Sequence, residues 1–195
     1  MTSRILFFST LFFMTLLAGS QAFDSRIDET SLAIAGQNQK GFLTRFTISA
    51  KQLEKAWWRY CREFGRPLNM KGYYKVTIPS ELNSGNVNLN LLSKSMSSKT
   101  GSTFFLALDR EGVPTDKVKA YHSQVEQILQ SFKVSFATEQ LEEQLADLEK
   151  DAKKTSKRVA KSTGNSKDRH LQELRKIEEK IEAIKLRLAE VNSAY

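Results

Sequence analysis

Residues that commonly act as nucleophiles, general bases or metal ligands are few in this 195-residue chain, which has one cysteine, Cys61, and two histidines, His122 and His170. A cysteine nucleophile needs a nearby base such as histidine, and a zinc site needs several ligands at short, regular spacings. Neither histidine stands at such a spacing from another ligand, and Cys61 lies beside the apolar positions of a predicted helix. We therefore expect Cys61 to be a buried apolar residue, and we predict no catalytic residue, no metal site and no cofactor.

The sequence also lacks a phosphate-binding glycine loop, a nucleophile elbow and the paired histidines of a zinc hydrolase. These absences favour a protein without catalytic activity. The alternative is an enzyme, for instance an envelope hydrolase, whose site carries no known motif.

Basic residues gather between residues 150 and 170, where eight lysines and arginines stand against Asp151 and Asp168. This excess accounts for most of the net charge of +8. Such a cluster can contact anionic lipid head groups or another polyanion, each basic group adding about 1 kcal/mol near a surface, or it can be a solvated helix end. No aromatic residue is interleaved to stack on bases, so we expect no nucleic-acid partner. The candidate polyanion-contact residues are Lys150, Lys153, Lys154, Lys157, Arg158, Lys161, Lys167 and Arg169.

Two adjacent tryptophans lie in a helix predicted over residues 50–64. Trp57 shares an apolar stripe with Leu53 and Tyr60, and we expect it in the core. Trp58 is turned about 100° away from this stripe, among charged neighbours. It either covers the edge of the core or is an exposed aromatic anchor for a partner.

The N-terminal segment has the layout of a secretory signal peptide, predicted over residues 1–22. Arg4 precedes the apolar run 5–18, and Ser20 and Ala22 supply the small side chains of a cleavage site. The run is shorter than the roughly 20 residues that span a bilayer, although a retained anchor is the alternative. No later apolar run is long enough to cross a membrane, so we predict a soluble protein in the periplasm or outside the cell. Because a single cysteine permits no disulfide within the chain, a bacterial envelope protein is favoured.

The mature chain is predicted to begin with a flexible arm over residues 23–40, followed by a small α+β domain over 41–135. Ser49 and Gln52 form a capping-box pattern at the start of the helix 50–64. About four antiparallel strands with helices on one face are expected. The alternating segments that predict these strands are 42–48, 74–78, 87–91 and 103–108, with turn-rich linkers at 80–85 and 95–102.

A second helix of this domain is predicted from Thr115, the expected N-cap, with an apolar stripe that reaches Phe132. Val134 and Phe136 continue the apolar pattern but favour strands. The sequence leaves open whether this helix is continuous across residues 134–136.

A long antiparallel helical hairpin is predicted over residues 136–195, because apolar residues recur there at heptad spacing in two series. The first series ends at Val159 and the second begins at His170. A turn at residues 163–166 brings the two series together as an intramolecular coiled coil, although pairing of one arm with another chain is the alternative. The paired positions lie at equal distances from the turn: 141 with 188, 145 with 184, 148 with 181, 152 with 177, 155 with 174, and 159 with 170.

These features favour an exported, non-catalytic protein of the bacterial envelope. Its α+β head is expected to bind a protein partner or an envelope surface, and its hairpin to act as a spacer or a second binding surface. In outline and charge the chain resembles the Skp-type periplasmic chaperones, which carry helical tentacles on a β body. This resemblance implies a holdase chaperone as the second hypothesis, but it rests on no shared motif and carries over no residue.

Overall fold

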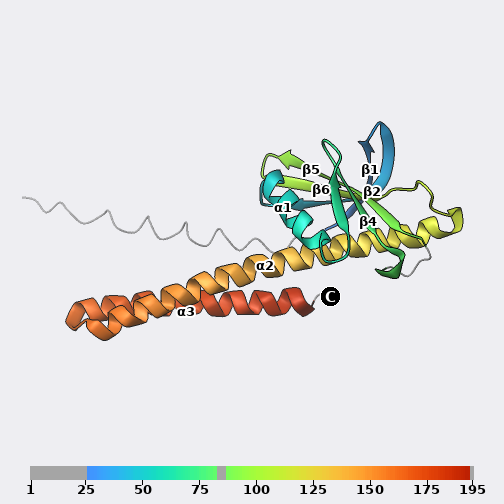
Figure 1. Ribbon diagram of the computed structural model, residues 1–195. Coiled ribbons are helices and arrows are strands. Elements are labelled where there is room, and N and C mark those ends of the chain that lie inside the picture. Colours follow the sequence, from blue (N-terminus) through green and yellow to red (C-terminus); the bar gives the residue numbers. More distant parts are fainter. Residues whose placement is uncertain (1–25, 83–86, 194–195) are drawn as a thin grey trace, which may run out of the picture.

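The computed structural model describes residues 26–82 and 87–193. The predicted signal peptide lies outside these residues. The described chain forms an α+β head followed by a long helical hairpin (Figure 1). The strands are β1 (Asp28–Ile34), β2 (Gln37–Phe46), β3 (Arg66–Asn69), β4 (Tyr74–Ile78), β5 (Leu89–Ser98) and β6 (Gly101–Leu108). The helices are α1 (Ala50–Cys61), α2 (Val118–Lys161) and α3 (Gly164–Ser193), with short 3₁₀ helices at Ser80–Leu82 and Thr115–Lys117.

Within the described residues, six strands form one antiparallel sheet in the order β1-β2-β6-β5-β4-β3. The predicted number of about four was wrong because the sequence pattern missed both edge strands. An edge strand has a neighbour on one side only, and here both edge strands bury few side chains, so their apolar alternation is weak. Strand β3 is also only four residues long and contains Pro67, which is tolerated at a sheet edge.

The prediction of a flexible arm over residues 23–40 was wrong for the same reason. Residues 28–34 form β1, and residues 37–40 are the start of β2. The two strands form a hairpin whose turn is Ala35-Gly36, with φ of 52° and 78°. Both residues of such a tight turn need positive φ, which glycine adopts readily. Ile34 anchors the hairpin, because its side chain is buried against the sheet.

The central hairpin of the sheet is longer than the sequence predicted. The segment 95–102, expected to be a linker, continues β5 to Ser98 and begins β6 at Gly101. Its serines obscured the strand pattern, although Ser102 is buried. Gly101 has φ of 147°, and a Cβ there would lie 2.2 Å from the carbonyl oxygen of Phe46. Glycine is therefore required where β6 passes β2.

Helix α1 begins where the capping box predicts. The Ser49 side chain accepts a hydrogen bond from the backbone N–H of Gln52, and the Gln52 side chain accepts one from the backbone N–H of Ser49. The helix ends at Cys61, three residues earlier than expected. Its buried face, with Leu53 and Trp57, lies on the sheet.

Helices α1 and α2 pack on one face of the sheet, as predicted, and enclose the main core (Figure 1). Trp57 from α1 and Phe132 from α2 meet at a ring separation of 5.0 Å, and both contact Phe104 of β6. A smaller cluster on the opposite face includes Phe105 and Leu92. The alternation of β6 between the two clusters explains why nearly every residue of that strand is buried.

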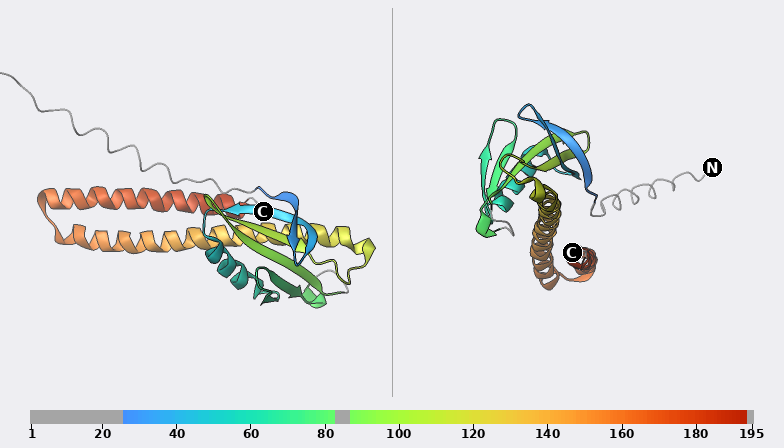
Figure 2. Two further views of the ribbon diagram at one scale, coloured as in Figure 1. Left: turned by 90° about the horizontal axis from the view of Figure 1, so that it is seen from above. Right: turned by 90° about the vertical axis from the view of Figure 1, so that its right-hand side faces the viewer.

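Helix α2 is continuous from Val118 to Lys161 and crosses residues 134–136 without a break. Its first part packs on the sheet through Val125, Leu129 and Phe132. Its second part leaves the head and forms one arm of the hairpin (Figure 2). The predicted N-cap was wrong: Thr115 lies in the preceding 3₁₀ helix, and the residue before α2 makes no side-chain cap.

The hairpin packs as predicted. Helix α2 ends at Lys161, and α3 begins at Gly164, whose φ of 56° reverses the chain. The base of the seam is a cluster centred on the buried Leu141, Ile184 and Val191. All twelve residues of the six predicted pairs are buried or half-buried. The two heptad series therefore face each other within one chain. Across residues 26–82 and 87–193, none of the helices combines the length and the apolar character that a bilayer span needs.

Candidate interaction surfaces

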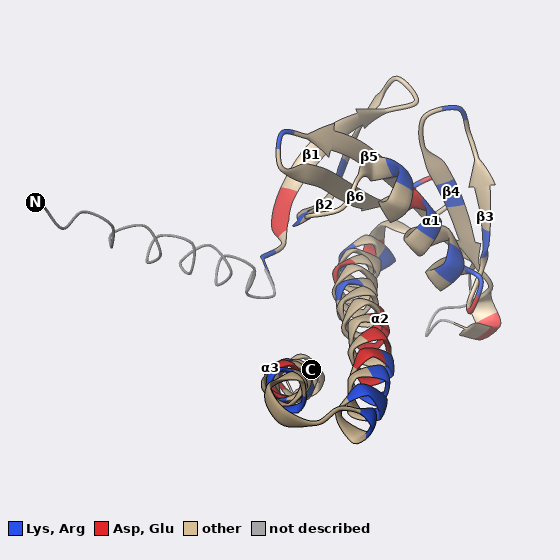
Figure 3. Ribbon diagram, turned by 90° about the vertical axis from the view of Figure 1, so that its left-hand side faces the viewer, with Lys and Arg blue, Asp and Glu red and all other residues tan. Residues whose placement is uncertain are grey.

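The basic cluster lies at the hairpin tip, at the end farthest from the head (Figure 3). The last turns of α2 and the first turns of α3 carry it, and the seam between them is closed there by the buried Thr155 and by the half-buried Val159 and His170. The eight predicted contact residues, Lys150, Lys153, Lys154, Lys157, Arg158, Lys161, Lys167 and Arg169, are all exposed. Over the described parts of the chain, none of the eight forms an ion pair with a carboxylate within 4.0 Å. The tip therefore presents its positive charge to the solvent.

The second predicted contact residue, Trp58, is exposed to 41% on the outer side of α1. The guanidinium of Arg62 lies 4.9 Å from the centre of its ring, which is a cation–π contact. Trp57, by contrast, is buried in the core as expected. The structure thus turns the two neighbouring side chains to different sides of α1, as the helical pattern predicted.

Trp58 lines a groove of about 470 Å³ between α1 and the edge strand β3. The sequence did not predict this groove, because β3 was not recognised as a strand. Its lining includes Leu68, which is exposed to 47%, and two arginines but no acidic residue. Tryptophan and arginine are enriched among the residues that contribute most to protein–protein binding, so this groove is a candidate contact surface. The residues that line the groove are Trp58, Arg62, Gly65, Arg66, Pro67, Leu68 and Asn69.

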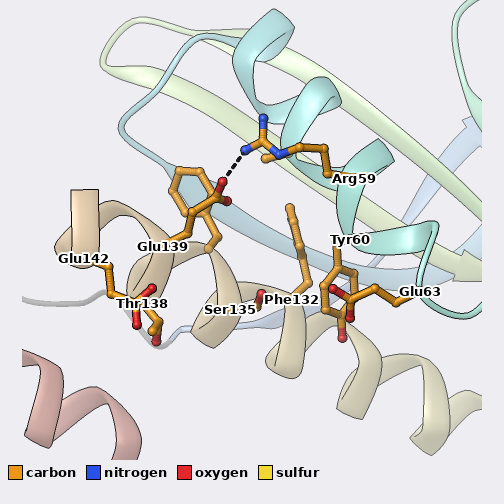
Figure 4. A pocket seen from close by; sticks show the side chains of 10 residues that line it. Arg59, Tyr60, Glu63, Phe132, Ser135, Thr138, Glu139 and Glu142 are labelled. Carbon is orange, nitrogen blue, oxygen red and sulfur yellow. Dashed lines mark hydrogen bonds and ion pairs between the residues drawn. The ribbon is translucent and has the colours of Figure 1, made fainter. Parts of the chain in front are cut away.

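A second groove, of about 450 Å³, lies between α1 and α2 where the hairpin leaves the head (Figure 4). Its floor is aromatic, with Tyr60 and Phe132, and its rim is charged. Arg59 Nη2 lies 2.7 Å from Glu139 Oε1, while the exposed Glu63 also lines the groove. Burial raises the pKa of Tyr60 to about 12, and a side-chain hydrogen bond with Ser131 offsets part of this rise.

Within residues 26–82 and 87–193, Cys61 and the two histidines do not form a nucleophile–base pair. Cys61 is fully buried among apolar side chains, and burial raises the pKa of its thiol well above the ordinary value. His122 Nε2 lies 2.9 Å from Glu29 Oε1, and His170 Nδ1 lies 3.4 Å from Glu173 Oε2. Each histidine therefore faces a carboxylate rather than the thiol.

The carboxylate of Glu29 also pairs with Lys40, at 2.8 Å. Hydrogen bonds from Lys40 and then from His122 lower the pKa of Glu29 below its usual value. This cluster joins β1 and β2 to the first turns of α2, and the His122 ring stacks on Phe42 at 4.6 Å. The sequence did not predict this cluster. Glu29 and Lys40 lie on the unrecognised β1–β2 hairpin, and His122 lies on α2, more than 80 residues later.

A buried lysine is the polar feature for which the sequence carried no indication. Lys133 is 2% exposed, and its ammonium donates hydrogen bonds to Thr44 Oγ1 at 2.6 Å and to the backbone carbonyl of Arg26 at 3.1 Å. It attaches the segment before β1 to the middle of α2. A buried ammonium with hydrogen-bond partners is stable where an isolated one is not.

The comparisons with known proteins give no relative on which these surfaces can be placed. No protein-family model matches the chain, and no curated protein or solved structure is significantly similar to it. Its function must therefore be inferred from its own surfaces.

Proposed function

We propose that this protein is an exported, non-catalytic interaction protein of the bacterial envelope. In this proposal the α+β head contacts a protein partner, and the hairpin is a spacer that carries a cationic tip to an anionic surface. The observation that carries the proposal is the concentration of eight exposed basic residues at the end of the hairpin, without ion-pair partners in the described chain.

The position of these charges supports a contact role more than their number does. Charged residues that only keep a helix surface hydrated are expected to be spread along the helix, where acidic and basic residues can pair three or four positions apart. Here most acidic residues of the projecting part of α2 lie in the half nearer the head, and its basic residues lie between Lys150 and the tip. A tip that concentrates positive charge over two adjacent helix ends gains about 1 kcal/mol per basic group at an anionic membrane surface.

The distance between tip and head supports the role of a spacer. From Glu139, the last α2 residue bridged to α1, to Lys161 the helix rises about 33 Å at 1.5 Å per residue. The intramolecular seam stiffens this arm, because each helix buries its apolar stripe on the other. A contact at the tip therefore holds the head at a defined distance from the surface.

Binding to vesicles tests the tip. We expect the chain without residues 1–22 to sediment with phosphatidylglycerol-containing vesicles and not with vesicles of phosphatidylcholine alone. Replacing Lys153, Lys154, Lys157 and Arg158 with glutamine is expected to weaken this binding at least about tenfold, since four groups near the surface contribute roughly 1 kcal/mol each.

The matched control removes four exposed lysines from the head, at Lys51, Lys55, Lys71 and Lys99. Both variants lose the same formal charge, so a general effect of net charge weakens both equally. Selective loss in the tip variant supports the proposal. Equal losses, or no binding of the unaltered chain to anionic vesicles, contradict it.

Export is tested separately, by the N-terminus of the protein isolated from a bacterial host. The signal pattern predicts a chain that begins near Phe23 and that fractionates with the periplasm or the medium. Mass spectrometry of the intact protein measures this directly. A chain that retains residues 1–22 in the cytoplasm contradicts the envelope assignment but leaves the anion-binding test valid.

The contact surface of the head is assigned to Trp58 and the neighbouring groove. A photo-crosslinking amino acid at position 58 is expected to capture a discrete envelope protein. The same residue at Leu186, which is exposed to 67% on the hairpin, is the control for random contacts. Identical adducts from both positions contradict a specific role of the Trp58 groove.

A further inference from the structure

The outer face of α2, which we define as the helix face opposite the seam with α3, separates its charges by sign. In the half nearer the head this face carries Glu139, Glu143 and Asp147, all exposed. In the half nearer the tip it carries five exposed lysines and no acid. These five residues are Lys150, Lys153, Lys154, Lys157 and Lys161. Figure 3 shows the acidic and then the basic bands along the side of α2 turned away from α3.

These charges are also arranged symmetrically about residue 150. Glu139 and Lys161 lie eleven positions from it, Glu143 and Lys157 lie seven, and Asp147 and Lys153 lie three. Each acidic residue thus has a basic counterpart at the same distance on the other side of Lys150. A two-fold axis through this point places each of these three acids of one copy at the level of a base of a second copy, while Lys150 faces Lys150.

We infer that two copies of this chain pair in antiparallel fashion along the outer face of α2, with the two-fold axis beside Lys150. Such an interface is isologous, since each copy contributes the same surface. It joins Glu143 of one copy with Lys157 of its partner and Asp147 with Lys153, each pair occurring twice. The occupant of the face is therefore a second copy of the chain, chosen by charge complementarity.

The shape of the molecule leaves room for this arrangement. The α2 residues that pack on the core of the head end at Phe136, and the ion pair of Glu139 with Arg59 marks the edge of the head. Beyond it the hairpin projects freely (Figure 2). The paired copies overlap over the projecting part of α2, with the heads at opposite ends.

The tip of each copy then lies beside the groove between α1 and α2 of its partner. That groove is lined by Glu63, Glu139 and Glu142, and its one basic residue, Arg59, is paired with Glu139 (Figure 4). Lys161, at the tip, is the counterpart of Glu139 of this groove, since both lie eleven positions from residue 150. The acidic rim of the groove thus continues the surface that receives the basic tip.

The interface is electrostatic and solvent-exposed, so it is weakened by salt. We expect a reversible dimer whose dissociation constant rises at least about tenfold between roughly 0.05 M and 0.5 M salt, as the screening length shortens. The inference goes beyond the proposed function and does not depend on it. Because the same lysines serve both contacts, an anionic surface competes with the second copy.

Charge reversal tests the pairing by sedimentation velocity at low salt. One variant carries Glu143→Lys and Asp147→Lys, and the other carries Lys153→Glu and Lys157→Glu. All four positions are exposed and face away from the seam, so both variants are expected to keep the helical circular dichroism of the wild type. We expect each variant alone to be monomeric and an equimolar mixture to form heterodimers, since each of the four altered positions then faces an opposite charge in the partner.

The matched control is Glu178→Lys with Glu179→Lys, which makes the same change of charge on the exposed side of α3. It is expected to dimerise like the wild type. The inference is overturned if the wild type is monomeric at low salt, if either reversed variant still dimerises, or if the mixture does not associate. The variant with Glu143→Lys and Asp147→Lys keeps the basic tip and should still bind anionic vesicles, so failure of the pairing and failure of the proposed function are distinguishable.

A second measurement does not depend on the reversed variants. In Lys150→Cys the new thiol lies at the two-fold axis, and a short bis-maleimide is expected to link two copies. Leu186→Cys places an equally exposed thiol on α3, where no link is expected. Equal yields of linked dimer from the two variants contradict the proposed axis.

Discussion

At the scale of single residues, the side chains that could react most readily, Cys61, Tyr60 and His122, lie in environments that suppress their reactivity. The Cys61 thiol is enclosed by apolar groups, and the Tyr60 side chain is partly buried, which raises the pKa of its hydroxyl. His122 is fixed between Glu29 and the ring of Phe42. The exposed residues that remain are suited to contacts, chiefly the lysines of the tip and Trp58.

We expect the Cys61 thiol to be almost unreactive in the folded protein. Only the thiolate attacks a disulfide reagent, and burial both raises the thiol pKa and blocks access. In a thiol assay with an aromatic disulfide at neutral pH, the native protein should react far more slowly than the protein in denaturant. Comparable rates in the two conditions contradict the burial of Cys61.

The raised pKa of Tyr60 predicts that the folded protein loses stability at alkaline pH. Its pKa in the fold is about 12, above the ordinary value of about 10. The folded state therefore holds this proton more tightly than the unfolded state does. The contribution of Tyr60 to the free energy of unfolding is therefore fully present below about pH 10. It is lost as the pH rises from there towards 12.

Urea unfolding at several alkaline pH values measures this effect. Tyr60→Phe removes the ionisable group and is expected to flatten the alkaline fall in the free energy of unfolding. Tyr73→Phe, at a residue outside the main core, is the control and should leave the fall unchanged. Equal alkaline profiles for wild type and Tyr60→Phe contradict the prediction.

At the scale of secondary-structure elements, each helix begins or packs through an identifiable local feature. The capping box of Ser49 and Gln52 satisfies backbone donors at the start of α1. Helix α3 is held by its seam, through Ile181, Ile184 and Val191. The strands depend more on their neighbours than on local pattern, most clearly at the two edges of the sheet.

Removal of the cap is expected to destabilise the head. Ser49→Ala eliminates the hydroxyl that accepts from the Gln52 backbone and should lower the free energy of unfolding by about 1 kcal/mol. Chemical denaturation followed by tryptophan fluorescence measures this, because Trp57 lies on the same helix. Ser98→Ala, at an exposed strand end, is the matched control. Equal stabilities of the two variants contradict the role of the cap.

The seam of the hairpin predicts a contrast between two positions of α3. Ile181→Ala leaves a cavity at a residue that is 9% exposed and should cost about 2–4 kcal/mol. Leu186→Ala, at a residue that is 67% exposed, should change stability by less than about 0.5 kcal/mol. Helical circular dichroism during urea unfolding gives both values. Similar losses for both residues contradict the assigned seam.

The difference between helices and edge strands explains which elements could be predicted from the sequence. The hairpin and α1 follow from periodicity and capping, because a helix buries one face along its own length. Strand β1 and the groove beside β3 could not be predicted in this way, since edge strands bury few residues. Lys133 could not be predicted either, because its partners Thr44 and Arg26 lie about 90 to 110 residues earlier in the chain.

At the scale of the whole molecule, the chain consists of an α+β head and a helical arm. The head supplies the apolar core, and its exposed Trp58 groove is the proposed partner contact. The arm carries a cluster of basic residues at the end farthest from that core. Both the proposed contact with an anionic surface and the inferred antiparallel pair require α3 to fold back on α2 within one chain.

A distance measurement between spin labels tests this requirement most directly. Labels at Glu149→Cys and Lys185→Cys occupy exposed positions on the two arms; the pKa of Lys185 is raised chiefly by its hydrogen bond with Glu182, and to a smaller extent by the charge of Glu149 on the other arm. The labelled chain also carries Cys61→Ala and is diluted with unlabelled protein, so that only distances within one molecule are recorded. We predict a single short distance, of about 20–30 Å. If α2 and α3 instead formed one extended helix, the 36 residues between the labels would separate them by about 54 Å, and a distance of that size would contradict the account.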